Sequence, residues 1–193
     1  TNQSSISSNR LLYTVLYPPG SYTDASDRLV TYAYNAQGQQ RRVLDQAGNA
    51  ITTVYDRAGR EVSRGVGVVS GYIEDVKRID MTYNPRGMVN TVSQYDASTA
   101  GNALDEVRYQ FDGWGNLTNF DQDVDSTFSG SSGGRWGVAY AFEKATPTGA
   151  GQNLRRTSQT LPGGGGIAYG YGTSGGIDDS LSRVAKISIG TTD

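Results

Sequence analysis

Three aspartates at alternate positions are the most suggestive candidates for chemistry in this sequence. Asp121, Asp123 and Asp125 match the D-x-D-x-D opening of a calcium-binding loop. Alternate carboxylates can converge on Ca²⁺, which takes about six to eight oxygen ligands. The sixth and twelfth loop positions hold Ser126 and Ser132 in place of the glycine and glutamate of that loop type. The sequence therefore leaves two interpretations open, a calcium site and a solvated acidic loop.

Two further groups of residues are candidates for catalysis or for phosphate binding. Adjacent Asp178 and Asp179 could supply the paired carboxylates of glycoside hydrolysis. Neighbouring residues of a strand point to opposite faces, so a turn is the expected role of this pair. Glycine-rich runs at 129–134 and 163–166 lack the lysine and the following helix of a phosphate loop. These runs are therefore predicted to be hairpin tips.

The composition excludes most familiar catalytic machinery. The 193 residues include no cysteine and no histidine, and the formal net charge is −2. A thiol nucleophile, an imidazole general base and a Ser-His-Asp triad are therefore absent. Weak acidity disfavours a nucleic-acid partner, because phosphate-binding surfaces are usually basic. No apolar run is long enough to span a membrane. The expectation is a protein without enzymatic activity and without a cofactor, calcium excepted.

A turn motif recurs along the chain, and its copies must set the positions of the strands that carry the candidate residues. An aromatic residue is followed by Asp or Asn, two free positions and Gly, in four copies: Tyr34, Asn35 and Gly38; Tyr55, Asp56 and Gly59; Tyr83, Asn84 and Gly87; Phe111, Asp112 and Gly115. A fifth copy at 45–49 lacks the aromatic residue, and aromatic pairs recur at 140–142 and 169–171. Asx at the first position and Gly at the fourth favour a type I turn with a G1 bulge. Each aromatic ring is predicted to end a strand and to stack on the ring of the neighbouring hairpin.

The segments between the turns read as strands. Alternating residues, 13 tyrosines and few lysines or glutamates favour a pleated sheet over helices. Strands are predicted over 28–34, 76–83, 88–95, 106–111 and 116–120, within an all-β meander of about a dozen strands. We expect an N-terminal strand segment and linker at 1–27 and hairpin repeats at 28–126. Degenerate glycine-rich hairpins at 127–193 are expected to continue the same sheet.

Exposed aromatic and basic residues offer two further expectations. Trp114 and Trp136, together with tyrosines, could form a platform for sugars, since aromatic faces stack on apolar sugar faces. The alternative is that Trp114 caps its turn. The pairs Arg41–Arg42 and Arg155–Arg156 are predicted to be exposed edge charges that discourage pairing between sheets.

The four aromatic turn motifs, with Arg60 after Gly59 and Leu117 after Asn116, resemble the YD repeats of the Rhs family. This resemblance implies a strip of hairpins that spirals into a hollow shell, as in bacterial Rhs toxins, insecticidal toxin complexes and teneurins. Such shells are extracellular or secreted, and they enclose a cargo or present an adhesive surface. The Asp-Pro pairs of the self-cleaving core segment in toxin shells are missing here, so no protease residue is carried over.

The resemblance and the composition together predict a structural role. The expected protein is a non-enzymatic segment of a secreted bacterial shell, tube or fibre. Its sheet edges would pair with other copies of the chain or with further repeats of a longer polypeptide. The alternatives are an extracellular adhesin or carbohydrate-binding module, with glycans as partners, and a cargo-encapsulating shell fragment of a polymorphic toxin.

Overall fold

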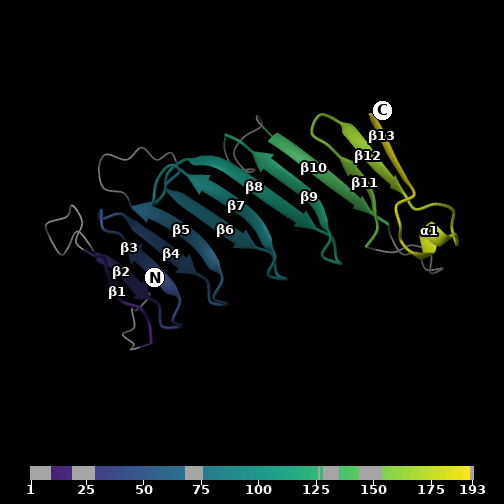
Figure 1. The fold of residues 1–193 in the computed structure, drawn as a ribbon. Coiled ribbons are helices and arrows are strands. Elements are labelled where there is room, and N and C mark those ends of the chain that lie inside the picture. Colours follow the sequence, from purple (N-terminus) through teal and green to yellow (C-terminus); the bar gives the residue numbers. More distant parts are fainter. Residues whose placement is uncertain are drawn as a thin grey trace. The chain divides into compact units, whose positions relative to one another are not determined.

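The chain folds almost entirely into β-strands. The computed structural model describes residues 10–18, 29–67, 76–125, 127, 135–143 and 154–191. These residues form thirteen strands and one short helix (Figure 1). The chain divides into two compact units, Thr1–Asp105 and Glu106–Asp193. The all-β prediction is confirmed. The domain boundaries predicted after residues 27 and 126 fall at positions outside the described residues and stay predictions.

The first unit is a meander in which each strand pairs antiparallel with the next. Its strands are β1 (Thr14–Leu16), β2 (Leu29–Tyr34), β3 (Gln40–Leu44), β4 (Ala50–Tyr55), β5 (Glu61–Gly67), β6 (Arg78–Tyr83) and β7 (Val89–Tyr95). The strands predicted at 28–34, 76–83 and 88–95 correspond to β2, β6 and β7, with ends that differ by at most two residues. Local alternation and turn signals were sufficient to place them.

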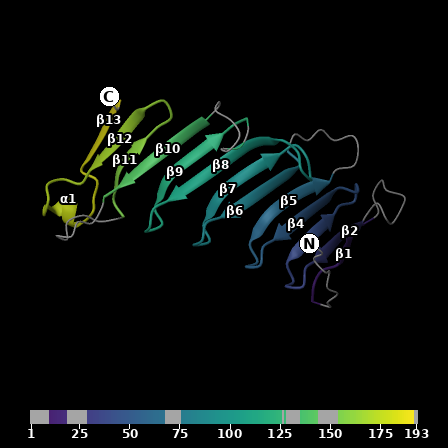
Figure 2. The same cartoon turned by 180° about the vertical axis from the view of Figure 1, so that it is seen from behind.

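The second unit repeats this plan. Its strands are β8 (Ala103–Phe111, beginning just before the unit), β9 (Leu117–Asp123), β10 (Arg135–Phe142), β11 (Arg156–Thr160), β12 (Gly165–Gly170) and β13 (Lys186–Thr191), which lie side by side in chain order (Figure 2). β9 extends past its predicted end at 120 because Asp123 pairs with Glu106 across the ladder, and β8 begins three residues earlier than predicted. Helix α1 (Ile177–Ser180), which the sequence did not indicate, connects β12 to β13. Within the described ranges no helix is long and apolar enough to cross a membrane.

Strand register gathers several apolar side chains on one face in part of each unit. In the first unit Val43 pairs with Ile51, and Ile51 with Val66, which places three apolar side chains on one face. The residues beside them, among them Thr52 and Gly65, point to the opposite face. In the second unit Phe120 pairs with both Tyr109 and Val138 on one face, whereas Asp121 pairs with Arg108 and Gly137 on the other.

Neither unit buries an apolar core in its described part. No described apolar side chain is buried, and the buried residues are polar or charged: Asn35, Thr53, Ser93, Asp123 and Arg155. A hairpin in such a sheet gains its stability from ladder hydrogen bonds and from the half-buried side chains of adjacent strands. The contacts that join one hairpin to the next therefore become the important structural sites.

Candidate functional site

The turns are built around one side-chain oxygen each. Asp56 Oδ1 accepts hydrogen bonds from the backbone N–H groups of Ala58 and Arg60, both at 2.9 Å. The N–H of Gly59 donates to the Asp56 carbonyl at 3.1 Å, and Gly59 has a φ of +80°. The ladder register shifts between Val54 and Tyr55, as a bulge requires. This arrangement is a type I turn followed by a glycine in the left-handed region.

The same geometry recurs wherever the motif occurs in the described residues. The Oδ1 atoms of Asn35, Asp45, Asn84 and Asp112 each accept two backbone N–H groups, from the residues two and four positions later. The corresponding glycines, Gly38, Gly48, Gly87 and Gly115, all have positive φ. A carboxylate or amide oxygen at the first position thus organises the whole reversal.

Hydrogen bonding in these turns favours the ionised carboxylates. The backbone N–H of Arg60, followed by its side chain, lowers the pKa of Asp56 below its ordinary value. At Asp45 the side-chain amide of Asn49 is the largest cause of a lowered pKa, and burial opposes it. The turns are therefore stabilised most when these aspartates are charged.

The tyrosines of the motif act through their hydroxyl groups. The prediction that their rings stack on one another is wrong, because the ring pair formed among the described residues is Tyr109 with Phe120, on adjacent strands of one hairpin. The hydroxyls of the motif tyrosines, and that of Tyr171 in the aromatic pair at 169–171, instead donate to carbonyls of earlier residues at 2.6 to 2.9 Å: Tyr34 to Leu12, Tyr55 to Gln40, Tyr83 to Glu61 and Tyr171 to Arg156. The sequence signal for these hydrogen bonds is tyrosine in place of phenylalanine, because the equivalent Phe111 has no hydroxyl group to donate.

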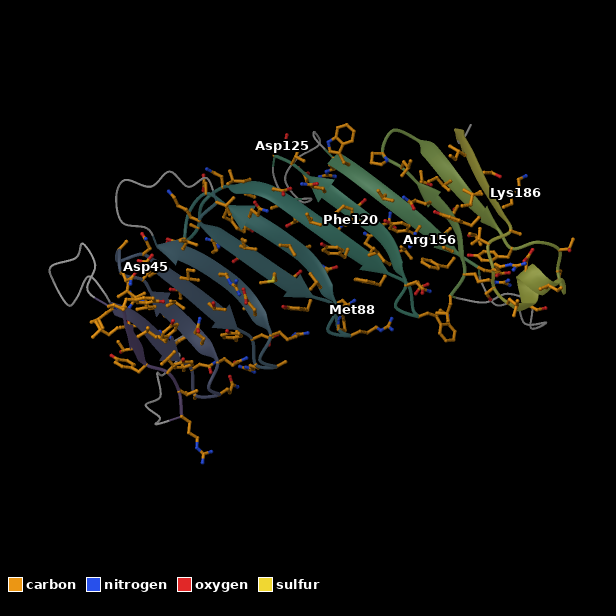
Figure 3. All side chains as sticks on the ribbon, viewed as in Figure 1. Asp45, Met88, Phe120, Asp125, Arg156 and Lys186 are labelled. Atoms are coloured by element: carbon orange, nitrogen blue, oxygen red, sulfur yellow. The ribbon has the colours of Figure 1, made fainter. Side chains whose placement is uncertain are left out.

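The three aspartates of the calcium hypothesis lie partly in a strand. Asp121 and Asp123 belong to β9, and their partners are Arg108 at 3.2 Å and Arg135 at 3.0 Å. Asp123 is fully buried, whereas Asp125 is exposed beyond the end of β9 (Figure 3). The described residues contain no group of three acidic side chains that could hold a metal ion. The calcium site stays a prediction.

Asp178 and Asp179 lie in α1 and bind two different arginines. Asp179 pairs with Arg155 at 2.7 Å, and Asp178 pairs with Arg183. The N–H of Gly175 and the Arg155 side chain both lower the pKa of Asp179. The two carboxylates do not face one another across a site, as glycoside hydrolysis would require.

The Arg155 side chain is buried and binds two carboxylates from other segments. The prediction that Arg155 is an exposed edge charge is therefore wrong. Its side chain is only 8% exposed, and it lies 2.6 Å from the Glu143 carboxylate as well as against Asp179. Its guanidinium also lies 5.0 Å from the centre of the Tyr171 ring. Residue spacing carries no signal for this cluster, because its members come from four separate segments.

The other three arginines of those pairs do not lie on edge strands either. Arg41 and Arg42 belong to β3, which pairs with β2 and β4. Arg156 belongs to β11, which pairs with β10 and β12, and its guanidinium lies 4.4 Å from the Tyr140 ring centre (Figure 3). An arginine in a central strand cannot protect an edge.

The two tryptophans are exposed but separate. Trp114 is 71% exposed in the turn before β9, and Trp136 is 57% exposed opposite Gln122, near the far end of β9. Leu117 and Gln122 are five residue steps apart along β9, which is about 17 Å. The two indoles therefore do not form one sugar platform.

The glycine run at 163–166 forms a hairpin turn and the start of a strand. Gly164 N–H donates to the Leu161 carbonyl at 3.1 Å, and Gly163 and Gly164 have positive φ. Gly165 and Gly166 begin β12. The run at 129–134 lies outside the described residues.

Three solved structures are similar to this chain at low identity. TcdB2–TccC3 without its hypervariable C-terminal region is 14% identical, with a TM-score of 0.38. TcdB2–TccC3–Cdc42 is 16% identical with a TM-score of 0.36, and the pore of the Photorhabdus luminescens Tc holotoxin is 15% identical with a TM-score of 0.38. Each match covers 84% of this chain but only 9% of the other chain. No protein-family model and no curated protein matches the sequence.

Proposed function

We propose that this chain is a structural, non-enzymatic segment of a secreted bacterial shell, tube or fibre. Its hairpins would form part of a wall, and its sheet edges would pair with other copies of the chain or with further repeats of a longer polypeptide. Enclosure of a cargo by such a wall belongs to the same proposal. The observation that carries it is the lack of any buried apolar side chain among the described residues.

The exposed apolar side chains support continuation at the end strands. Ile187 and Ile189 of β13 are 60% and 85% exposed, and Leu12, Tyr13, Leu16 and Tyr17 are exposed in and around β1. Within the described residues, β13 pairs with β12 alone. β13 carries one charge, Lys186 at its start, and the residues from Ile187 to Gly190 have neither a charge nor a proline, which are the usual means of preventing edge pairing. A further strand on β13 would cover both isoleucines.

Two hollows in the described part of the surface have the lining of a wall and offer no catalytic group. One of about 380 Å³ lies over β4 and β5, and one of about 270 Å³ lies over β11, β12 and β13. Their linings are alanine, glycine, serine, threonine, valine, isoleucine and one glutamine, without an acid or a base. General acid–base chemistry needs such a group within hydrogen-bonding reach of its substrate. The adhesin alternative is less well supported, because the two exposed indoles lie apart.

The association of this chain in solution tests the proposal. Ile189→Lys places a charge on the β13 edge, and Ile177→Lys is the matched control, since Ile177 is similarly exposed but lies in α1. Sedimentation over a range of concentrations is expected to show multimers for the parent chain and for Ile177→Lys, and fewer for Ile189→Lys. Purely monomeric parent protein, or equal association of both variants, would contradict pairing through this edge.

A further inference from the structure

The turns of the first unit lie at the two ends of its strands. In this subsection, each of these two rows of strand ends is called an edge, and the edge on which a turn lies matters for the residue that follows the turn glycine. The turns at 35–38, 56–59 and 84–87 connect β2 to β3, β4 to β5 and β6 to β7, so they share one edge. The turn at 45–48 connects β3 to β4 and lies on the other edge. Figure 3 labels Asp45 and Met88, which mark these two edges. Successive turns of one edge are separated by two strand spacings, about 9.5 Å.

Gln39, which follows Gly38, joins its own turn to the next turn of the same edge. Its Oε1 accepts a hydrogen bond from Asn35 Nδ2 at 2.8 Å. Its Nε2 donates to the carbonyl of Gly59 at 2.7 Å. One side chain therefore bridges the first residue of one turn and the glycine of the next.

Arg60 occupies the equivalent position after Gly59 and makes the equivalent bridge with different chemistry. Its guanidinium pairs with Asp56 in its own turn, with Nη2 2.6 Å and Nε 2.8 Å from Oδ2. The same guanidinium lies 4.4 Å from the ring centre of Tyr83, the residue before the next turn of this edge. Its Nη1 is 3.6 Å from the point where a Cβ on Gly87 would lie. Arg60 thus extends from its own aspartate to the next turn.

The opposite edge provides a natural contrast. Asn49 follows Gly48 and donates from Nδ2 to Asp45 Oδ2 at 2.9 Å, within the same turn. Asparagine satisfies its own aspartate but is too short to cross two strand spacings, whereas glutamine and arginine have the reach. Gln39 and Arg60 hold their own turns in the same way and, in addition, contact the next turn of their edge.

We propose that the residue after the turn glycine is a positioning residue that joins consecutive hairpins along one edge, and that Gln39 and Arg60 perform this role in the first unit. The inference goes beyond the wall function, because it concerns how neighbouring hairpins hold one another whatever assembly the chain enters. Cation–π contact and planar hydrogen-bonding geometry suit arginine to a bridge of this kind.

Arg60→Asn separates the two tasks of Arg60. It copies Asn49, so its amide can still hold Asp56, but it cannot reach Tyr83. Amide hydrogen exchange in the full chain is the readout. We expect exchange at Gly87 and Met88, in the next turn, to rise about two- to fivefold, while exchange at Gly59 stays unchanged. Arg64→Asn is the matched control, because Arg64 is exposed and pairs with Glu61 on its own strand.

A double-mutant cycle gives an independent measure. Arg60→Asn and Tyr83→Leu are combined, and the unfolding equilibrium constants are compared. Joined residues should show a non-additive effect of about two- to fivefold. Additive effects, or exchange that rises at Gly59 but not at Gly87, would overturn the proposal. The exchange measurement on Arg60→Asn alone remains decisive if the double variant fails to fold.

Discussion

The Tyr83 hydroxyl donates a hydrogen bond to the carbonyl of Glu61, 2.6 Å away and 22 residues earlier in the chain. In the same way, the Tyr55 hydroxyl donates a hydrogen bond to the carbonyl of Gln40 at 2.8 Å. In both cases the acceptor is the second residue after the glycine of the preceding turn on that edge. The tyrosine that ends one strand is thereby fixed to the start of the strand before it, beyond the last residue pair of the ladder between the two strands.

Replacing Tyr83 by phenylalanine tests this contact. Tyr83→Phe keeps the ring against Arg60 and removes the donor to Glu61, so we expect a loss of about 0.5–1.5 kcal/mol in unfolding free energy. Urea unfolding measures it. Tyr95→Phe is the control, because its ring lies against Arg78 and should remain there. Equal midpoints for the two variants would argue against the hydroxyl contact.

Substitution of Gly59 tests the turn conformation. Valine at this position would take a φ near +80°, and its Cβ would lie 3.3 Å from Gln39 Nε2. We expect Gly59→Val to destabilise the protein by about 1–3 kcal/mol, measured by thermal or urea unfolding. Gly113 is a turn glycine without positive φ and with open space at its Cβ position, so Gly113→Val should cost less. Similar losses for both variants would reject the requirement for positive φ.

Acid should weaken the turns that use aspartate. The pKa values of Asp45 and Asp56 are lowered from 3.8 in the folded chain. A carboxyl with a depressed folded pKa contributes stability above its unfolded pKa, and this contribution is lost as the pH falls through the folded pKa. The melting temperature should therefore fall as the pH is lowered below about 4.

Other turns of the same protein show which substitution can test this acid effect. Asn35 and Asn84 hold the same turn position as the two aspartates, so Asp45→Asn with Asp56→Asn should keep the Oδ1 acceptors without titration. We expect the double variant to lose less melting temperature than the parent between about pH 5 and pH 3. Parallel pH profiles would show that these carboxylates do not govern the acid response.

Arg155 should be the most sensitive arginine of the second unit. Arg155→Met leaves the carboxylates of Glu143 and Asp179 without their shared partner, so we expect a lower melting temperature and faster proteolysis near α1. Arg183→Met is the control, because Arg183 is well exposed and pairs with Asp178 at the surface. Comparable effects of the two substitutions would contradict a special role for the buried guanidinium.

The turns could be predicted because their determinants lie within a few residues of one another. Asp56, two free positions and Gly59 specify a type I turn with a left-handed glycine before any tertiary contact is considered. The strands between the turns followed from alternation, and the end of β9 differed where a cross-strand partner extended it, as Glu106 does for Asp123.

The contacts between hairpins could not be predicted from spacing alone. Tyr83 and Glu61 are 22 residues apart, and Arg155 and Asp179 are 24 apart. Which of several exposed-looking arginines becomes buried depends on how the segment carrying α1 folds back. The hydrogen bonds of the tyrosine hydroxyls are equally hidden from spacing, because their acceptors lie 15 to 22 residues away in the chain.

The sequential pairing of strands has a consequence for how the chain acquires its fold. Within each unit every strand pairs with its immediate neighbours in sequence, so no ladder waits for a distant segment. Such a topology has a low contact order for an all-β protein, and the entropy of loop closure stays small at each step. Folding can begin at whichever hairpin forms first and spread in both directions, strand by strand.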